Sequence, residues 1–206
     1  HAVYSLKHLN ANYIGVEAVR IFYEIQRHFY RHLARSQGTR YFDPVSEEYL
    51  ETGLGTLADE IATPGNHRLK HLPSWHFDMV PDRSQDLVTA TFVLNEVAPA
   101  GIVWLMSHMI RTLREGGILY IRDSRKNKPN RHGLKYDDAL LELGFEEVAH
   151  LDVVNRVDMF GLPRAYRKLL HEAYSFEELF ERYFGKFAVT VHQGNFMQNL
   201  PKSMQS

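Results

Sequence analysis

The chain has 206 residues, of which 44% are hydrophobic and 24% are charged, and its formal net charge is −1. This length fits one domain with a sizeable core and an added segment, and the near-neutral charge excludes a global basic field that would gather nucleic acid or anionic lipid. Cysteine is absent, which excludes a disulfide scaffold, a cysteine-ligated zinc site and a thiol nucleophile, and is compatible with a reducing compartment. No apolar run approaches the roughly 20 residues that span a bilayer, and no signal peptide is visible, so we expect a cytoplasmic protein without a membrane partner.

Predicted helices and strands alternate along most of the chain. Apolar residues at helical spacing predict a helix over 2–9, and short apolar runs that end in an acid predict buried parallel strands over 13–17 and 118–124. Further helices are predicted over 18–35, 99–117 and 135–145, and further strands over 67–72, 86–90, 146–154 and 163–170. This alternation indicates an α/β fold with a mostly parallel sheet, and the last two strands, which follow each other without a helix, indicate an antiparallel pair at one edge.

The stretch "ETGLGTLADE" at 51–60 looks like a nucleotide-binding glycine loop. Between Gly53-Leu54-Gly55 and the strand at Asp86, however, there is room for only about one βαβ unit of roughly 30 residues. A ribose-binding acid follows such a loop by about 20 residues, and counting back from Glu17 reaches the first residue or just before it. We therefore interpret Gly53-Leu54-Gly55 as a decoy in a partly helical insertion, and expect the cofactor loop immediately upstream of this chain.

The stretch 81–123 resembles the second half of a class I S-adenosylmethionine-dependent methyltransferase. The positions that agree with the pattern of that superfamily are Pro81, Asp82, Ser84, Asp86, Leu87, Val88, Val93, Leu94, Val97, Leu113, Gly116, Gly117, Ile118 and Asp123. Upstream, "YIGVEAV" resembles the second strand of these enzymes, whose terminal acid holds the cofactor ribose. The resemblance covers roughly residues 2–170, leaves 171–206 as a C-terminal extension, and is closest to sugar and small-molecule O-methyltransferases. It implies a Rossmann-like sheet with helices on both faces, S-adenosylmethionine as cofactor, and a small-molecule or glycan acceptor.

Three departures from the methyltransferase pattern leave alternatives open. Gln85 replaces a frequent aromatic residue, Asn95-Glu96 replaces a common histidine pair, and no glycine loop precedes Glu17. An inactive methyltransferase-like module of a larger protein is therefore a second hypothesis. A nicotinamide-dependent oxidoreductase is a third, disfavoured because "LREGGILYIRD" fits the methyltransferase pattern and Tyr136 has no lysine four residues on.

The resemblance implies cofactor-binding roles for residues at the carboxyl ends of three strands. Glu17 is expected to accept hydrogen bonds from both ribose hydroxyls, since an ionised carboxylate only accepts, and Ala18 would pack under the adenosine. The Ser74 hydroxyl would meet the adenine amino edge and the Trp75 indole its ring face, with Asp78 as an alternative. Thr91 and Phe92 would line the cofactor cleft. The competing interpretations are a solvated acid for Glu17 and a core side chain for Trp75.

A hydroxyl acceptor needs a base within hydrogen-bond reach, and the catalytic candidates are Glu96, Asp123 and His132. Each could instead cap a helix or be solvated, and we expect the alignment of the acceptor with the methyl carbon to matter more than any base. The basic segment 122–131 could grip a phosphate- or carboxylate-bearing acceptor, or be a solvated loop.

The histidines do not indicate a metal site. His28 and His32 have a metal-binding spacing but no acid-rich partner, and the cluster of His67, His71 and His76 would be split across the faces of a strand, so no metal is expected. In the C-terminal extension, Ser175 with Glu178 predicts a capping box before a helix over 175–187. This extension is a candidate lid, oligomer contact or start of a further domain.

Overall fold

The computed structural model describes residues 1–46, 53–63, 67–91, 93–94, 97, 99–122, 136–148, 164–170, 174, 178 and 181. The chain divides into two compact units, His1–Pro81 and Asp82–Ser206, and each unit builds its own sheet. The fold is α/β with mostly parallel strands covered by helices, as the sequence predicted.

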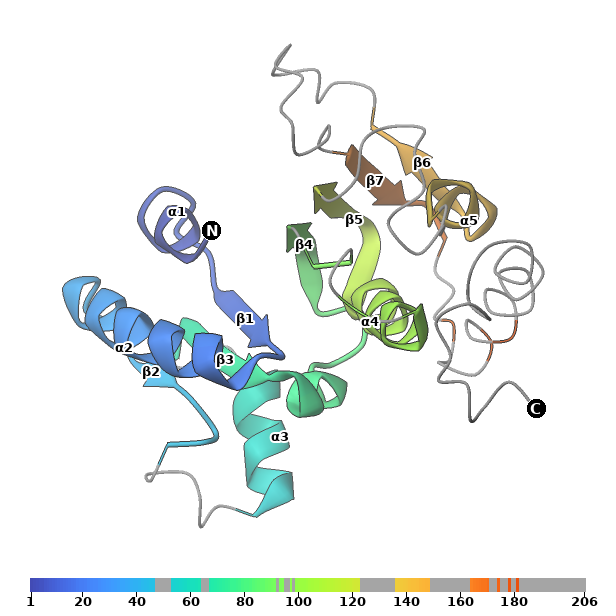
Figure 1. The fold of residues 1–206 in the computed structure, drawn as a ribbon. Helices are drawn as coiled ribbons and strands as arrows, with labels where there is room; N and C mark the ends of the chain where they lie inside the picture. Colours follow the sequence, from blue (N-terminus) through green and yellow to red (C-terminus); the bar gives the residue numbers. More distant parts are fainter. Residues whose placement is uncertain are drawn as a thin grey trace, which may run out of the picture. The chain divides into compact units, whose positions relative to one another are not determined.

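The sheet of the first unit contains three parallel strands in the order β1-β3-β2 (Figure 1). They are β1 (Tyr13–Glu17), β2 (Tyr41–Phe42) and β3 (Leu69–Pro73). The predicted strand over 13–17 is confirmed with the same bounds, and the strand predicted over 67–72 is confirmed as β3. The two-residue strand β2 was not predicted.

The helices of the first unit are α1 (Ala2–Lys7), α2 (Arg20–Ser36), α3 (Leu54–Ala62) and the 3₁₀ helix η1 (Ser74–Met79). The helices predicted over 2–9 and 18–35 are thus confirmed as α1 and α2. Gly38 follows α2 with a φ of 60°, a left-handed conformation that glycine adopts without strain. Gly53 is the N-cap of α3 and Gly55 lies inside that helix, whereas a phosphate-binding loop leads directly from a strand into a helix.

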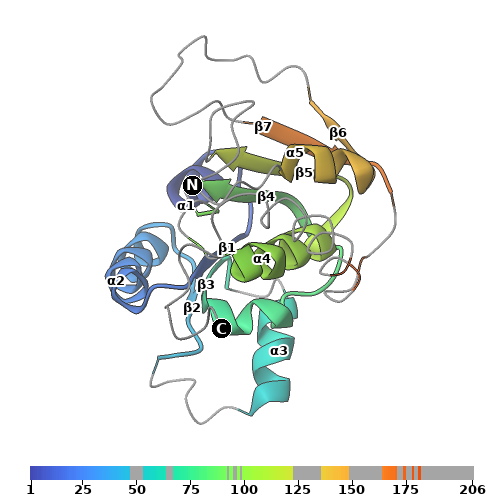
Figure 2. The ribbon, with the colours of Figure 1, turned by 45° about the vertical axis from the view of Figure 1, so that its right-hand side comes forward.

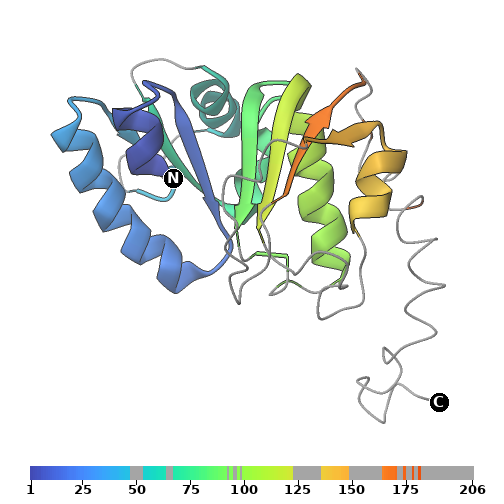
Figure 3. The same cartoon turned by 90° about the horizontal axis from the view of Figure 1, so that it is seen from above.

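Strand β3 is covered on both faces. Successive side chains of a strand point to opposite faces. Leu69 belongs to the apolar cluster formed with α1 and α2, whereas the next side chain, Lys70, reaches the end of α3. Figure 3 shows α2 and α3 on opposite sides of the strands, and all five residues of β3 are buried. Its neighbour β1 has one fully buried residue, Gly15.

Lys70 closes the C-terminus of α3 from inside the core. Its ammonium group donates hydrogen bonds to the carbonyl oxygens of Ile61 at 2.7 Å and Thr63 at 2.6 Å, and to that of Glu60. These are among the carbonyls that a helix end leaves without an intrahelical partner, and a cation there also complements the helix dipole. Burial lowers the pKa of Lys70.

The sheet of the second unit has the order β4-β5-β7-β6. Strands β4 (Gln85–Thr91) and β5 (Leu113–Arg122) pair in parallel, whereas β7 (Arg164–Lys168) runs antiparallel to both β5 and β6 (Phe145–Glu147). Helix α4 (Pro99–Thr112) packs against β5, and α5 (Tyr136–Glu142) packs against β6 (Figure 2). The predicted antiparallel pair at the edge of the sheet is therefore confirmed.

The boundary between α4 and β5 differs from the prediction. The helix predicted over 99–117 ends at Thr112, and β5 begins at Leu113 rather than at residue 118. Lys168 of β7 donates hydrogen bonds to the carbonyl oxygens of Ile110 and Leu113, both at 2.9 Å, and so satisfies the last turn of α4. Gly116, with a φ of 73°, lies within β5 and does not cap the helix.

The helix predicted over 135–145 is confirmed as α5, and Gly144 follows it with a φ of 80°. A Cβ at this position would lie 2.3 Å from a Leu170 side-chain carbon, so any other residue would require the leucine to move and would adopt a left-handed conformation that favours glycine. Of the predicted helix over 175–187, only Glu178 and Glu181 belong to the described residues, and the proposed boundary at residue 170 stays a prediction. None of the described helices is long and apolar enough to cross a membrane.

We predict that Lys70→Met destabilises the first unit by about 1–3 kcal/mol, because the methionine stem fills the same space but leaves buried carbonyls of α3 without a donor. Urea unfolding of both proteins measures the difference in the free energy of unfolding. Lys7→Met is the matched control, since Lys7 is exposed in the last turn of α1, and it should change stability little. Equal effects of the two substitutions would contradict the capping role of Lys70.

Candidate functional site

Glu17, the last residue of β1, has a carboxylate that is fixed by two hydrogen bonds from neutral groups. Its Oε1 accepts a hydrogen bond from the backbone N–H of Val19 at 2.9 Å, and its Oε2 accepts one from Nε2 of Gln26 at 2.9 Å. Both donors are neutral, and among the described residues no cationic side chain pairs with Glu17. A carboxylate offers about four acceptor positions, so roughly one position on each oxygen is left for a ligand. Two adjacent hydroxyl groups match such a pair of acceptors.

Ser74 and Trp75 lie at the same edge of the sheet as Glu17. Strands β1 and β3 are parallel neighbours in which Glu17 is opposite Pro73, and Ser74 and Trp75 begin η1 directly after β3. Trp75 is 62% exposed, so it is not a core side chain, and its ring lies beside that of His76 with centroids 6.2 Å apart. The carboxyl ends of these strands thus bring together an acceptor, a hydroxyl and an exposed aromatic face, the groups that recognise a nucleoside.

The other sequence-predicted site residues are placed as follows. Ala18 is exposed directly after β1, and Asp78 is exposed in η1. Thr91 is the last residue of β4 in the second unit. Four candidates lie outside the described residues: Phe92, Glu96, Asp123 and His132. Their roles stay predictions.

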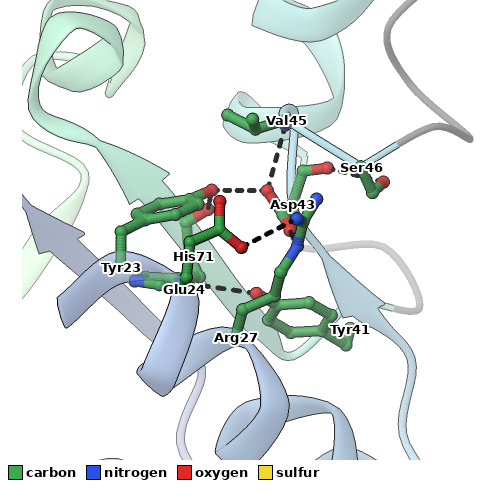
Figure 4. A network of polar contacts seen from close by, with 8 residues as sticks. All are labelled: Tyr23, Glu24, Arg27, Tyr41, Asp43, Val45, Ser46 and His71. Atoms are coloured by element: carbon green, nitrogen blue, oxygen red, sulfur yellow. Dashed lines mark hydrogen bonds and ion pairs between the residues drawn. The ribbon is translucent and has the colours of Figure 1, made fainter. Parts of the chain in front are cut away.

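A buried polar network links α2, β2 and β3, and sequence reasoning did not anticipate it (Figure 4). Its centre is Asp43, which is 1% exposed and directly follows β2. The Asp43 carboxylate accepts hydrogen bonds from the Tyr23 hydroxyl, from Nε of Arg27 and from the Val45 backbone N–H at 3.0 Å. Burial raises the pKa of Tyr23, and the neighbouring carboxylate raises it further. Both carboxylate oxygens of Asp43 accept hydrogen bonds from protein groups, so this acid has a structural role.

His71 completes the network from β3. It is fully buried, its ring stacks on that of Tyr23 with centroids 4.0 Å apart, and its Nδ1 lies 3.1 Å from the Tyr41 hydroxyl. Among the described residues its Nε2 has no hydrogen-bond partner. Burial lowers the pKa of His71 to about 4, although the Asp43 carboxylate acts in the opposite direction. The imidazole is therefore neutral at physiological pH.

The other histidines that the sequence raised as possible metal ligands lie elsewhere in the first unit. His28 and His32 are exposed on α2, and His67 pairs with the Glu60 carboxylate. Within the part of the chain that the structure describes, no group of three or more histidine and acidic side chains could hold a metal ion.

No protein-family model and no curated protein sequence matches this chain. Among solved structures, it is similar to the 1,6-didemethyltoxoflavin-N1-methyltransferase of Burkholderia thailandensis with bound 1,6-didemethyltoxoflavin and S-adenosylhomocysteine. The sequence identity is 18%, the match covers 82% of this chain and 76% of that one, and the TM-score is 0.42. It is also similar to phosphoethanolamine N-methyltransferase 1 of Haemonchus contortus in complex with phosphoethanolamine and S-adenosylhomocysteine, at 12% identity over 86% of this chain and 43% of that one, with a TM-score of 0.41. At these identities and TM-scores neither similarity assigns the chain to a family.

We predict that His71 makes the stability of the first unit depend on acid. Its pKa is lowered from 6.5 to about 4 in the folded state. Between these two pH values His71 therefore binds a proton in the unfolded chain but not in the folded one. Stability is therefore complete above pH 6.5, falls as the pH drops toward 4, and loses about 3 kcal/mol over that window. The groups that face His71 are Tyr23, Tyr30, Tyr41, Asp43 and Arg27.

Denaturant unfolding at several pH values between 4 and 7 measures this dependence. His71→Gln lacks the titrating ring, so its stability should change less over the same window than that of the wild type. Parallel curves for the two proteins would show that other groups cause the acid sensitivity.

Proposed function

We propose that this protein transfers the methyl group of S-adenosylmethionine to a hydroxyl group of a sugar or another small molecule. The observation that carries the proposal is the Glu17 carboxylate, held by two neutral donors at the carboxyl end of β1 with one acceptor position left on each oxygen. The methyltransferase-like pattern of residues 81–123 supports it independently. In open α/β sheets, ligands bind at the carboxyl ends of the strands, where Glu17 lies.

Each residue of this edge has a role in holding the cofactor. Glu17 accepts hydrogen bonds from the two ribose hydroxyls, and Ala18 leaves room for the adenosine beside it. The Ser74 hydroxyl meets the polar edge of the adenine, and the exposed indole of Trp75 covers the ring face. Thr91 and Phe92 stay cofactor-binding candidates on the sequence resemblance alone.

S-adenosylmethionine, when bound, supplies an electrophilic methyl group on a sulfonium sulfur. The task of the protein is then to hold the acceptor oxygen in line with the methyl carbon and to remove the hydroxyl proton. Glu96, Asp123 and His132 are the proposed bases for that proton.

The cofactor assignment is tested by isothermal titration calorimetry with S-adenosylhomocysteine. We expect a dissociation constant on the order of micromolar for the wild type, which Glu17→Gln raises about tenfold or more, since a hydrogen bond to a charged group contributes about 1.5–3 kcal/mol. Trp75→Ala should weaken binding without lowering the thermal stability, because the indole is 62% exposed. Glu142→Gln, an exposed acid of α5, is the control and should bind like the wild type.

Absence of binding by the wild-type chain would contradict the proposal and favour the methyltransferase-like module without activity. Binding that Glu17→Gln leaves unchanged would place the ribose elsewhere. If the cofactor binds, incubation with methyl-labelled S-adenosylmethionine and a set of free sugars tests the hydroxyl acceptor, and label recovered on amines but not on hydroxyls would contradict that part.

A further inference from the structure

We propose that Gln26 is a positioning residue for the Glu17 carboxylate and thereby sets the preference of this site for a ligand with two neighbouring hydroxyl groups. This inference rests on the proposed role of Glu17 in ribose binding. It names a residue of α2 that the sequence pattern did not single out.

The geometry shows how the carboxylate is oriented. The Val19 N–H belongs to the residue that caps the start of α2 and holds Oε1, whereas the Gln26 amide, nearly two turns further along the same helix, holds Oε2. Two donors from one rigid element, one on each oxygen, define the plane of the carboxylate. With Val19 alone, the glutamate side chain could rotate about its terminal bonds, and the free acceptor positions would have no fixed direction.

The type of residue at position 26 matters as much as its place. An arginine there would bind the carboxylate through two parallel hydrogen bonds and neutralise its charge. The glutamine amide donates one hydrogen bond, is neutral, and leaves the negative charge in place. The carboxylate therefore attracts hydroxyl donors and repels a phosphate, so the site selects an unmodified ribose over a phosphorylated one.

Among the described residues, the Gln26 side chain hydrogen-bonds only to Glu17, and Gln26 is half-buried, so its replacement by leucine should disturb the fold little. Without Gln26, the Glu17 carboxylate is still present but its orientation is no longer fixed, and a binding group that is not preorganised binds its ligand more weakly. We therefore expect Gln26→Leu to weaken the binding of S-adenosylhomocysteine about five- to twentyfold, an indirect effect at or below the lower end of what one directly lost hydrogen bond to a charged group would give. Gln26→Glu should weaken it further, because it sets a second negative charge against Glu17.

The experiment is calorimetric titration of S-adenosylhomocysteine into the full chain, the Gln26 variants, Glu17→Ala, and the double variant Glu17→Ala/Gln26→Leu. A positioning role predicts that Gln26→Leu has no further effect once Glu17 is alanine, a non-additivity that a general loss of stability would not produce. Gln37→Leu is the matched control, since Gln37 caps the other end of α2 and its side-chain amide donates a hydrogen bond to Ser36, far along the helix from Glu17.

The outcomes separate this inference from the proposed function. If the wild type binds and Glu17→Ala weakens binding while Gln26→Leu does not, the function stands and the role of Gln26 is refuted. Additive losses in the double variant would also refute it. If the wild type does not bind S-adenosylhomocysteine, the proposed function fails and this inference fails with it.

Discussion

Strand β3 lies between two layers of helices and carries two consecutive ionisable residues into the core. Burying an unpaired polar group costs roughly 1–3 kcal/mol or more, so Lys70 and His71 each need a partner on their own face. Lys70 finds the last carbonyls of α3, and His71 finds Tyr41 and the ring of Tyr23. These contacts cap the end of α3 and tie α2 to the sheet. Because β1 pairs with β3 in register, they also support the edge at which Glu17 lies.

The second unit also has a buried strand lysine that caps the end of a helix. Lys168 is buried in β7 and closes the C-terminus of α4, as Lys70 of β3 closes that of α3. A lysine stem packs well in the interior if its ammonium group reaches acceptors, and the end of a helix supplies several unpaired carbonyls at one point. In both units a lysine of a strand thus caps the end of a helix. This long-range constraint explains why a local pattern failed at residues 113–117: the donor that ends α4 comes from 55 residues beyond Leu113.

The sequence predicted those elements whose signal is local. The apolar run of β1 ends in an acid, and the amphipathic period of α2 is long, so both were found within two residues of their bounds. Strand β2 is two residues long and exists through its pairing with β3, which no local pattern reports. The candidate site was predicted in the same uneven way. Glu17 was singled out as a candidate because it ends a strand, whereas Gln26 resembles any other polar residue of a helix in the sequence, and the fold shows its amide at Glu17.

Two acids lie at the carboxyl ends of the parallel strands on either side of β3, and their hydrogen-bond partners decide which of them could bind a ligand. Asp43, after β2, is buried and bound by a tyrosine, an arginine and a backbone N–H. Removing this charge would break the ion pair with Arg27 and leave the Tyr23 hydroxyl and the Val45 N–H without their acceptor, which is costly. Glu17, the last residue of β1, has only neutral donors among the described residues, one on each oxygen, and remains half-exposed. A ligand that brings hydroxyl groups therefore completes the hydrogen bonding of Glu17 without breaking an existing ion pair, whereas at Asp43 it would have to displace one. An acid at the end of a strand thus stabilises the fold at β2, whereas at β1, among the described residues, it keeps acceptor positions available to a ligand.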